Sequence, residues 1–314
     1  GMIYSAGAVH IPNPVTDNAW LRQSLWFGMA LLAFTVLVRV PPRWIEWVAV
    51  PAYVISIVLL GITLIIGTGA GTAVGVRSWI DLGFIGFQPS EIAKLATILV
   101  VARVLSQRAP PLTSLKDLLV PSILVGLPLG LVMLQPDVGT AIAFVGILFA
   151  MLYWAGTPVA LLLLVASPVV GLFLSYDTRI WAFYILALIG FLYIYRYRLF
   201  LFESVALGVA NFASATISRP LWNSLATYQQ NRILVYLDPE VDPRGAGYQI
   251  IQSKVAIGSG GVMGQGFTLG SQKRYDFLPE QHTDFIFSVI GEELGFLGAA
   301  LAIAVFAYVL SRIV

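Results

Sequence analysis

Several side chains able to carry proton-transfer chemistry stand together just before the last long apolar segment of the sequence. Glu280, His282, Thr283 and Asp284 fall within five residues, and the apolar segment that begins at Asp284 runs to Leu310. Ionisable residues at membrane depth usually face a protein interior or a wet cavity and mark function. A carboxylate here could take a proton from a reacting hydroxyl, whereas the simpler alternative is that Thr283 or Asp284 caps the following helix.

A carboxylate and an ammonium group stand three residues apart in the segment 88–94. Pro89 suits the first turn of a helix and Glu91 suits the positive end of the helix dipole. Glu91 and Lys94 would then lie on one helix face. Two interpretations stay open: an ion pair that orders the start of the helix, and a pair that lies beside a substrate.

Gln135, Pro136 and Asp137 interrupt a long apolar stretch with an amide, a proline and an acid. This pattern indicates a helical hairpin or a broken helix. Asp137 either caps an outer turn, which Asp residues do in many proteins, or contributes with Gln135 to a functional site.

The segment 252–267 concentrates glycine beside Lys254. A glycine-rich backbone can expose amides to an anion, as phosphate-binding nests do, whereas flexible turns are the alternative explanation. The segment lacks both the ending of a Walker loop and the strand that precedes a dinucleotide fingerprint. Further along, Glu292 and Glu293 lie deeper in the last apolar segment, and we predict a structural role for them.

The composition indicates a membrane protein. Of the 314 residues, 58% are hydrophobic and 11% charged, which is less than half the charged fraction of an ordinary soluble domain. The net charge of +2 is too small to indicate a nucleic-acid partner. Cysteine is absent, and two histidines, His10 and His282, are too few for a histidine-rich metal cluster. Any chemistry must therefore depend on carboxylates, cations and amides.

Apolar runs of the length that a membrane span needs, roughly 20 residues, recur along the chain. They indicate about nine spans after an N-terminal stub at residues 2–9, without the alternation that β-barrels show. We therefore predict an all-α, polytopic membrane bundle in which residues 1–314 form a single transmembrane domain. The stub and the stop at Val314 lead us to expect a fragment of a longer protein. The predicted spans are 19–38, 44–66, 89–105, 118–134, 138–154, 159–174, 180–195, 199–215 and 284–310.

Arginine and lysine occupy alternate ends of these spans, around Arg39, Arg103, Arg196 and Arg312. Short loops rich in these residues face the cytoplasm. The sequence therefore predicts two extracytoplasmic loops, residues 67–88 and 216–281. The longer loop contains pieces that suit short amphipathic helices over the outer face.

Taken together, these segments resemble the shape, elongation, division and sporulation (SEDS) family of bacterial membrane proteins. The likeness covers most of the chain from Arg77 onward, and it is specific because the motifs occur in this order with these spans between them. The matching motifs are Arg77-Ser78-Trp79-Ile80-Asp81-Leu82-Gly83, Gln88-Pro89-Ser90-Glu91-Ile92-Ala93-Lys94, Gln135-Pro136-Asp137, Leu237-Asp238-Pro239-Glu240, Gly245-Ala246-Gly247-Tyr248-Gln249, Gln252-Ser253-Lys254 through Gly266, and Pro279 to Phe287.

The resemblance implies a peptidoglycan glycosyltransferase that polymerises lipid II into glycan strands outside the bacterial cytoplasmic membrane, for cell elongation and shape. It also implies a partner, a class B penicillin-binding protein with transpeptidase activity, alongside lipid II and membrane lipid. Asp284 would match the essential acid of the family. Glu91 and Lys94 would match a pair lining the same cavity, and Trp79 would match an important loop tryptophan.

The sequence departs from the family pattern in two places. The family normally continues through two further helices that carry a Gly- and Pro-rich signature, and nothing like it follows Val314. The three spans predicted between residues 159 and 215 also exceed the number expected there, although an odd number preserves the orientation.

Glycosyl transfer from a diphosphate lipid needs a base for the attacking hydroxyl and charge stabilisation for the departing diphosphate. We expect a single inverting displacement with Asp284 as the base and no organic cofactor. The charge at the diphosphate would come from Arg232, Lys254, Lys94 or a divalent cation, Mg²⁺ or Mn²⁺. The expected substrate-binding residues are Glu91, Lys94, Trp79, Arg77, Gln135, Asp137, Arg232, Lys254, Glu280, His282 and Thr283.

Two other classes of function stay open. The same bundle could act as a flippase for a lipid-linked precursor or as a proton-coupled transporter, which would require a polar path that reaches both faces. The polar residues are concentrated outside, which favours surface chemistry, whereas Glu292 and Glu293 keep transport open. A membrane scaffold for a cell-wall complex would retain its function when the acids are substituted.

Overall fold

The chain divides into two compact units, which are considered in turn. Unit 1 comprises Gly1–Val38 and Trp222–Val314, and unit 2 comprises Arg39–Leu221. The prediction of one transmembrane domain over the whole chain stays a prediction. The computed structural model describes residues 2–7, 19–69, 77–81, 86–108, 112, 114–195, 201–224, 227, 230–231, 234–235, 238–243, 245–270 and 284–313.

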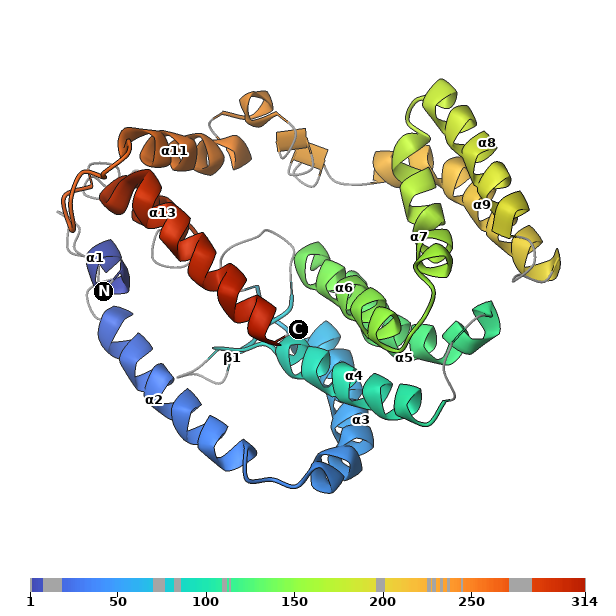
Figure 1. Cartoon of the computed structure of the whole chain (residues 1–314), viewed down its shortest axis with the longest axis horizontal. Coiled ribbons are helices and arrows are strands. Elements are labelled where there is room, and N and C mark those ends of the chain that lie inside the picture. The colour runs from blue at the N-terminus through green and yellow to red at the C-terminus, as the bar shows by residue number, and fades with distance from the viewer. Residues whose placement is uncertain are drawn as a thin grey trace. The chain divides into compact units, whose positions relative to one another are not determined.

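Each of the predicted apolar segments forms a helix in the described part of the chain (Figure 1). Helices are favoured because a helix satisfies its interior backbone groups within itself, which lipid cannot do. The long helices are α2 (Ala19–Leu37), α3 (Pro42–Ile66), α4 (Pro89–Ser106), α5 (Leu115–Leu134), α6 (Val138–Trp154), α7 (Val159–Leu174), α8 (Thr178–Tyr195), α9 (Leu201–Ser224) and α13 (Ile286–Ile313). The shorter elements are α1 (Met2–Gly7), β1 (Ile80–Asp81), β2 (Gly86–Phe87), the 3-10 helix η1 (Pro239–Val241) and α11 (Ala246–Ser259).

Five of the described helices, α2, α3, α5, α9 and α13, are long and apolar enough to cross a membrane. Three more, α6, α7 and α8, are apolar but slightly shorter. The apolar side chains of α2 are exposed along the whole helix, as expected of a surface in contact with lipid. The fold is thus the predicted all-α, polytopic membrane bundle, and the number of nine spans stays a prediction.

The C-terminal end of α9 differs from the prediction, which began a loop at residue 216. The helix continues to Ser224. The hydroxyls of Thr216 and Ser218 donate to carbonyls three residues earlier in the same helix, at 2.8 and 2.9 Å. Polar residues are accommodated in this way without ending the helix, because each hydroxyl finds an acceptor on the helix itself.

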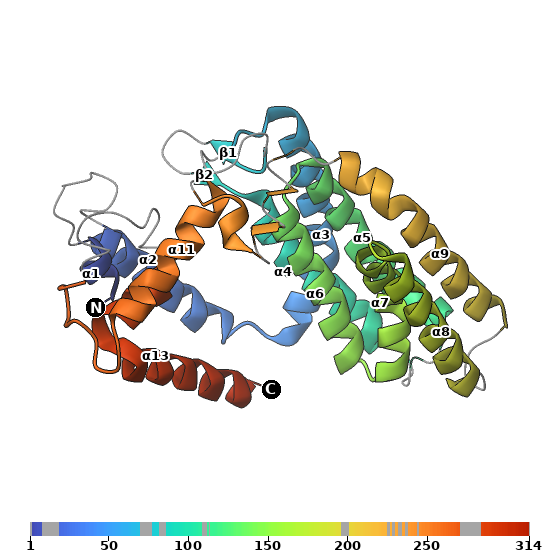
Figure 2. The ribbon, with the colours of Figure 1, turned by 90° about the horizontal axis from the view of Figure 1, so that it is seen from above.

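The core of unit 2 lies among α3, α4, α5 and α6, which pack side by side (Figure 2). Leu60 of α3 and Phe144 of α6 are fully buried in it. Ala93 and Ala96 of α4 belong to the same core, and such small residues let membrane helices approach closely. This packing brings together the end of α3, the start of α4 and the α5–α6 turn, where several candidate site residues lie.

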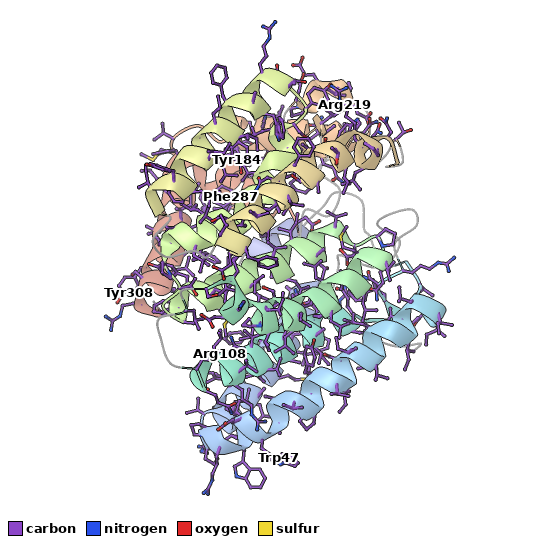
Figure 3. All side chains as sticks on the ribbon, turned by 90° about the vertical axis from the view of Figure 1, so that its right-hand side faces the viewer. Trp47, Arg108, Tyr184, Arg219, Phe287 and Tyr308 are labelled. Carbon is purple, nitrogen blue, oxygen red and sulfur yellow. The ribbon has the colours of Figure 1, made fainter. Side chains whose placement is uncertain are left out.

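The helices α7, α8 and α9 form a second group within unit 2, joined by a small leucine cluster and by a polar network. Tyr184 of α8, labelled in Figure 3, donates from its hydroxyl to the carbonyl of Ser167 on α7 at 2.6 Å. Asn211 of α9 donates to the Ser167 hydroxyl at 2.8 Å. Hydrogen bonds of this kind between membrane helices fix which helices pair, because apolar contact alone discriminates little in lipid.

The predicted loop 67–88 contains a short antiparallel hairpin in place of irregular chain. β1 pairs with β2, and Thr68 pairs with Trp79 just outside it. The Thr68 amide donates to the Trp79 carbonyl at 2.8 Å, and the Trp79 amide donates back at 3.1 Å. The backbone that leaves α3 and returns to α4 thereby satisfies part of its hydrogen bonding locally.

In unit 1, α11 packs against the first part of α13 (Figures 1 and 2), and α1 contacts both α13 and α2. Both η1 and α11 fall in the segment 216–281, where the sequence predicts short helices. α1 occupies part of the predicted N-terminal stub.

Candidate functional site

Asp284 lies at the start of α13, two residues before the first helical residue, Ile286. Its side chain is exposed. In the described part of the chain, no backbone amide and no cation bonds to its carboxylate. The carboxylate is therefore accessible to a substrate hydroxyl, and the described hydrogen bonds do not include the helix cap that was the alternative role.

A hydrogen bond between two hydroxyl groups links α11 to α13. The Oγ atoms of Ser253 and Ser288 lie 2.6 Å apart, and one of them donates to the other. Lys254 follows Ser253 directly and is exposed, while Asp284 precedes Ser288 by one helical turn. This contact joins the helix that carries Lys254 to the helix that follows Asp284.

The glycine-rich segment after α11 packs on the backbone of α13. The amides of Gln265 and Gly266 donate to the carbonyls of Glu292 and Glu293, at 2.9 and 3.0 Å. These two amides therefore cannot serve an anion. Of the two alternatives for the segment 252–267, the phosphate-binding nest does not apply to these two amides, because their hydrogen bonds join two segments of the protein. The same bonds show that this part of the segment is packed and is more than a flexible turn.

α13 is broken at Gly295, whose φ of 66° and ψ of −163° are not helical. The amide of Phe296 donates to the Gly261 carbonyl at 2.9 Å instead of to a carbonyl of its own helix. Gly264, at a φ of +83°, lies so close that a Cβ atom there would be 2.1 Å from the carbonyl oxygen of Glu293. Only glycine permits this approach of two backbones.

Glu292 and Glu293 are fully buried within unit 1, at 0% and 1% exposure. The Ser5 hydroxyl of α1 donates to the Glu293 carboxylate, with its oxygen 2.5 and 2.7 Å from the two carboxylate oxygens. The contact ties α1 to α13. This geometry supports the structural role that the sequence predicts for Glu293.

Glu91 and Lys94 form an ion pair at the start of α4. The Lys94 ammonium lies 2.8 Å from Glu91 Oε1. The Lys94 side chain is 25% exposed and that of Glu91 60% exposed, so both stay accessible to a molecule in water. The predicted pairing is confirmed, and the exposure leaves the second interpretation, a place beside the substrate, open as a prediction.

Asp137 caps α6, as the structural alternative predicts. Its carboxylate accepts hydrogen bonds from the amide of Thr140 at 3.1 Å and from the Thr140 hydroxyl at 2.9 Å. It also accepts one from the side-chain amide of Gln88 at 3.3 Å. Because Gln88 directly precedes α4, this contact joins the start of α4 to the start of α6.

Gln135 is buried, with 1% exposure. Its side-chain amide donates to the Leu60 carbonyl at 3.1 Å, and its backbone carbonyl accepts from the backbone amide of Arg77 at 3.4 Å. Gln135 therefore holds α3, the hairpin segment and the α5–α6 turn together. This is a positioning role, and direct contact with a substrate stays a prediction.

Trp79 is partly buried beside the hairpin, and Arg77 is exposed. A Cβ on Gly86 would lie 3.2 Å from the Trp79 ring, so the indole packs closely against this glycine. Unit 2 thus gathers Trp79, Arg77, Gln135, Asp137 and the Glu91–Lys94 pair at one end of its bundle.

The other predicted site residues, Arg232, Glu280, His282 and Thr283, lie outside the described residues. Within the described residues no group of three His, Asp or Glu side chains could hold a metal ion. Sequence reasoning missed Gln88, Ser253 and Ser288. A usable signal existed for Ser288, since a hydroxyl within an apolar helix usually contacts a neighbouring helix.

The chain matches the model of a family described as "Cell cycle protein", which carries the names FtsW, RodA and SpoVE, over residues 2–184 and 174–314. The chain belongs to this family. The likeness to the SEDS family is thereby confirmed, since FtsW, RodA and SpoVE are its members. In this FtsW/RodA/SpoVE chain, unit 1 contributes the exposed acid at the start of α13 and unit 2 the ion pair at the start of α4 as candidate functional residues, each considered within its own unit.

Individual relatives and solved structures agree with this assignment. The peptidoglycan glycosyltransferase MrdB of Escherichia coli K12 is 36% identical over 312 residues, which cover 99% of this chain and 71% of MrdB. A solved chain from "Structural coordination of polymerization and crosslinking by a peptidoglycan synthase complex" is 29% identical, with a TM-score of 0.61 over 99% of this chain and 73% of that one. Rod shape determining protein RodA of Thermus thermophilus is 25% identical, with a TM-score of 0.54 over 99% of this chain and 67% of RodA.

Proposed function

We propose that this protein is a peptidoglycan glycosyltransferase that polymerises lipid II into glycan strands. The main support for this activity is the sequence identity of 36% with MrdB, a peptidoglycan glycosyltransferase, over 99% of the chain. A second observation supports the chemistry: the carboxylate of Asp284 is exposed at the head of α13, where a hydroxyl can reach it.

In the proposed reaction, Asp284 accepts the proton of the attacking sugar hydroxyl. The new C–O bond forms at the anomeric carbon of the other sugar while the bond from that carbon to the diphosphate breaks, and the configuration inverts. The diphosphate leaves as an anion without a proton. One carboxylate is therefore enough, in contrast to glycoside hydrolysis, where a second carboxyl protonates a poorer leaving group.

The cations Lys94 and Lys254 are the candidates to stabilise the negative charge on the departing diphosphate. Both are accessible, Lys94 with 25% exposure and Lys254 on the exposed face of α11. Arg232 is a third candidate from the sequence. A divalent cation such as Mg²⁺ or Mn²⁺, if bound with the substrate, would supply further positive charge to the departing diphosphate.

The proposed location is the bacterial cytoplasmic membrane, with the reaction on the extracytoplasmic side. The support is the distribution of Arg and Lys, which favours a cytoplasmic position for the α2–α3, α4–α5 and α8–α9 connections. The proposed partner is a class B penicillin-binding protein, a transpeptidase. The similar chain from the peptidoglycan synthase complex, in which polymerization is coordinated with crosslinking, supports that partner.

The decisive experiment gives lipid II to the purified protein in detergent, alone and with the partner, and measures glycan polymer on gels. Asp284→Asn keeps the size of the side chain and removes the base, so polymer formation should fall by at least about a hundredfold. The matched control is Glu46→Gln, which removes an exposed acid outside the candidate site and should leave the rate unchanged.

Full activity of Asp284→Asn, with unchanged thermal unfolding, would remove Asp284 from the mechanism. The same assay separates the other functions. A flippase or a proton-coupled transporter moves lipid-linked precursor or protons without making polymer, and a scaffold makes none in any variant.

A further inference from the structure

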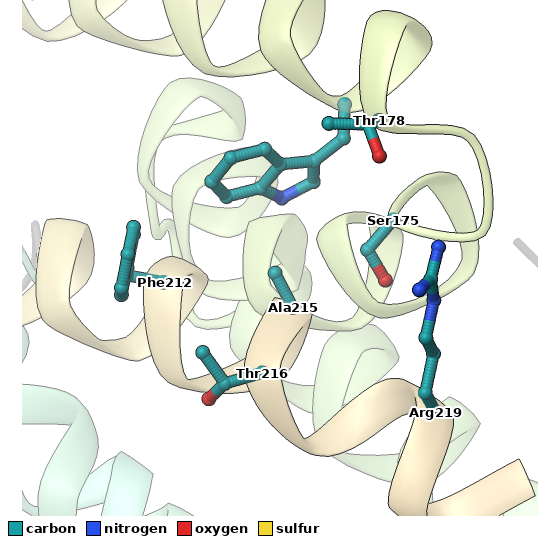
Figure 4. Close-up of a pocket in the computed structure, with 7 residues that line it drawn as sticks. Ser175, Thr178, Phe212, Ala215, Thr216 and Arg219 are labelled. Atoms are coloured by element: carbon teal, nitrogen blue, oxygen red, sulfur yellow. The ribbon is translucent and has the colours of Figure 1, made fainter.

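A cavity of about 410 Å³ lies among α7, α8 and α9 in unit 2 (Figure 4). Its volume is in the range of small-molecule sites, roughly 300–1,000 Å³. None of the residues that line this cavity takes part in the proposed reaction. The lining residues are Ser175, Thr178, Trp181, Phe212, Ala215, Thr216 and Arg219.

Two side chains of this cavity can only donate hydrogen bonds, and neither has an acceptor among the described residues. The Trp181 indole nitrogen is buried without a hydrogen-bond partner there. The Arg219 guanidinium likewise has no carboxylate at ion-pair distance in the described part of unit 2. Because a buried indole N–H normally finds an acceptor, the cavity suits a ligand that brings acceptor oxygens and negative charge.

The rest of the wall combines three hydroxyl side chains, those of Ser175, Thr178 and Thr216, with an apolar part. The rings of Trp181 and Phe212 meet edge to face, with centroids 5.9 Å apart and an interplanar angle of 60°. Ala215 lies beside them, one turn before Arg219 on α9. A ligand that fills the cavity therefore combines an anionic head at Arg219 with an apolar part against the rings.

The position of the cavity along the helices indicates what such a ligand is. It lies at the α7–α8 turn, where the apolar part of α9 gives way to polar residues such as Ser218 and Asn223. This is the level of the membrane–water interface, where Trp and Arg side chains meet lipid headgroups. In the proposed orientation it is the extracytoplasmic interface.

We propose that this cavity binds the phosphate-bearing headgroup of an anionic membrane lipid. Arg219 pairs with the phosphate, because guanidinium and phosphate form strong charge-assisted hydrogen bonds. The Trp181 N–H donates to a phosphate or ester oxygen, and the first methylene groups of the acyl chains contact Trp181 and Phe212. Bound lipid would then cover the outer end of the α7–α9 group.

Native mass spectrometry of the purified chain in detergent, with added palmitoyl-oleoyl phosphatidylglycerol, tests this proposal. Arg219→Gln should weaken lipid binding roughly tenfold, because the charge-assisted pair is lost. Trp181→Phe keeps the ring packing, removes the N–H donor and should weaken binding severalfold. Arg179→Gln is the matched control, since Arg179 stands at the start of the same helix α8, is exposed and does not line the cavity.

Equal binding by Arg219→Gln and Arg179→Gln, with all variants unfolding at the wild-type temperature, would overturn the proposal. Two further ligands identify the chemistry. Palmitoyl-oleoyl glycerol has the same chains without phosphate and should not bind, and its retention would refute the role of phosphate. Inorganic phosphate at millimolar concentration should not displace the lipid, and displacement would assign the site to free phosphate instead.

Discussion

The hydroxyl oxygens of Ser253 and Ser288 lie 2.6 Å apart, and they join the helix that carries Lys254 to the helix that begins beyond Asp284. Ser288 is buried, with 3% exposure. A buried hydroxyl that loses its hydrogen-bond partner is still shielded from water, so the free energy of its desolvation is no longer compensated. The pair is therefore a local link on which the position of Asp284 relative to α11 depends.

Ser288→Ala should destabilise the protein by about 1–2 kcal/mol, because the Ser253 hydroxyl loses its partner. The double variant with Ser253→Ala should cost less than the sum of the two single variants, since no hydroxyl is then left alone. Thermal unfolding of the purified protein in detergent measures both effects. Strictly additive shifts would show that the two hydroxyls do not interact.

Gly264→Ala should destabilise unit 1 by more than about 2 kcal/mol, since the backbone there is left-handed and a Cβ would collide with the Glu293 carbonyl. Gly258→Ala is the matched control on α11, where a Cβ meets nothing within 4 Å. That substitution should stabilise its helix by up to about 1 kcal/mol. Thermal unfolding measures the stability of both variants, and equal effects of the two substitutions would contradict the close packing at Gly264.

Lys94→Met should leave stability nearly unchanged, because a partly exposed ion pair contributes at most about 1 kcal/mol. Its effect should appear in catalysis as a KM for lipid II raised by roughly tenfold, if Lys94 contacts the diphosphate as proposed. Arg103→Gln at the other end of α4 is the control, since Arg103 also lies near an acid, Glu46, at 3.9 Å. If the two variants have equal KM and kcat values, the role of Lys94 is only to order the start of α4.

Asp137→Asn and Asp137→Ala separate capping from substrate binding. Asn retains an acceptor for the Thr140 amide, so stability should stay within about 0.5 kcal/mol, whereas Ala should lose about 1 kcal/mol or more. Because both carboxylate oxygens already accept hydrogen bonds, we expect Asp137→Asn to polymerise lipid II at nearly the wild-type rate. A large loss of rate in a stable Asp137→Asn protein would instead reveal a need for its charge.

The helices were predictable because their signal is local. A long apolar run can satisfy its backbone in lipid only as a helix, and α6 and α7 have the predicted bounds, Val138–Trp154 and Val159–Leu174. The Glu91–Lys94 pair and the Asp137 cap were predictable for the same reason, since each depends on residues three apart in one helix or at its start.

The contacts between distant segments were not predictable from one sequence. The glycines of the segment 252–267 permit an anion nest, a flexible turn or a close approach of two backbones, and their type alone does not select among these. The choice depends on the carbonyls of Glu292 and Glu293, which lie far along the chain. The link of Gln88 to Asp137 likewise depends on how α4 and α6 pack.

The break of α13 at Gly295 divides that element into two rods with different surroundings. Both rods are bonded to the segment after α11, the first through the carbonyls of Glu292 and Glu293 and the second through the amide of Phe296. The second rod, residues 296–313, presents a largely apolar, exposed surface. A tilt of the second rod in a bilayer of different thickness would therefore have to break its hydrogen bonds to that segment. The break at Gly295 thus couples the tilt of the exposed rod to the segment that follows α11.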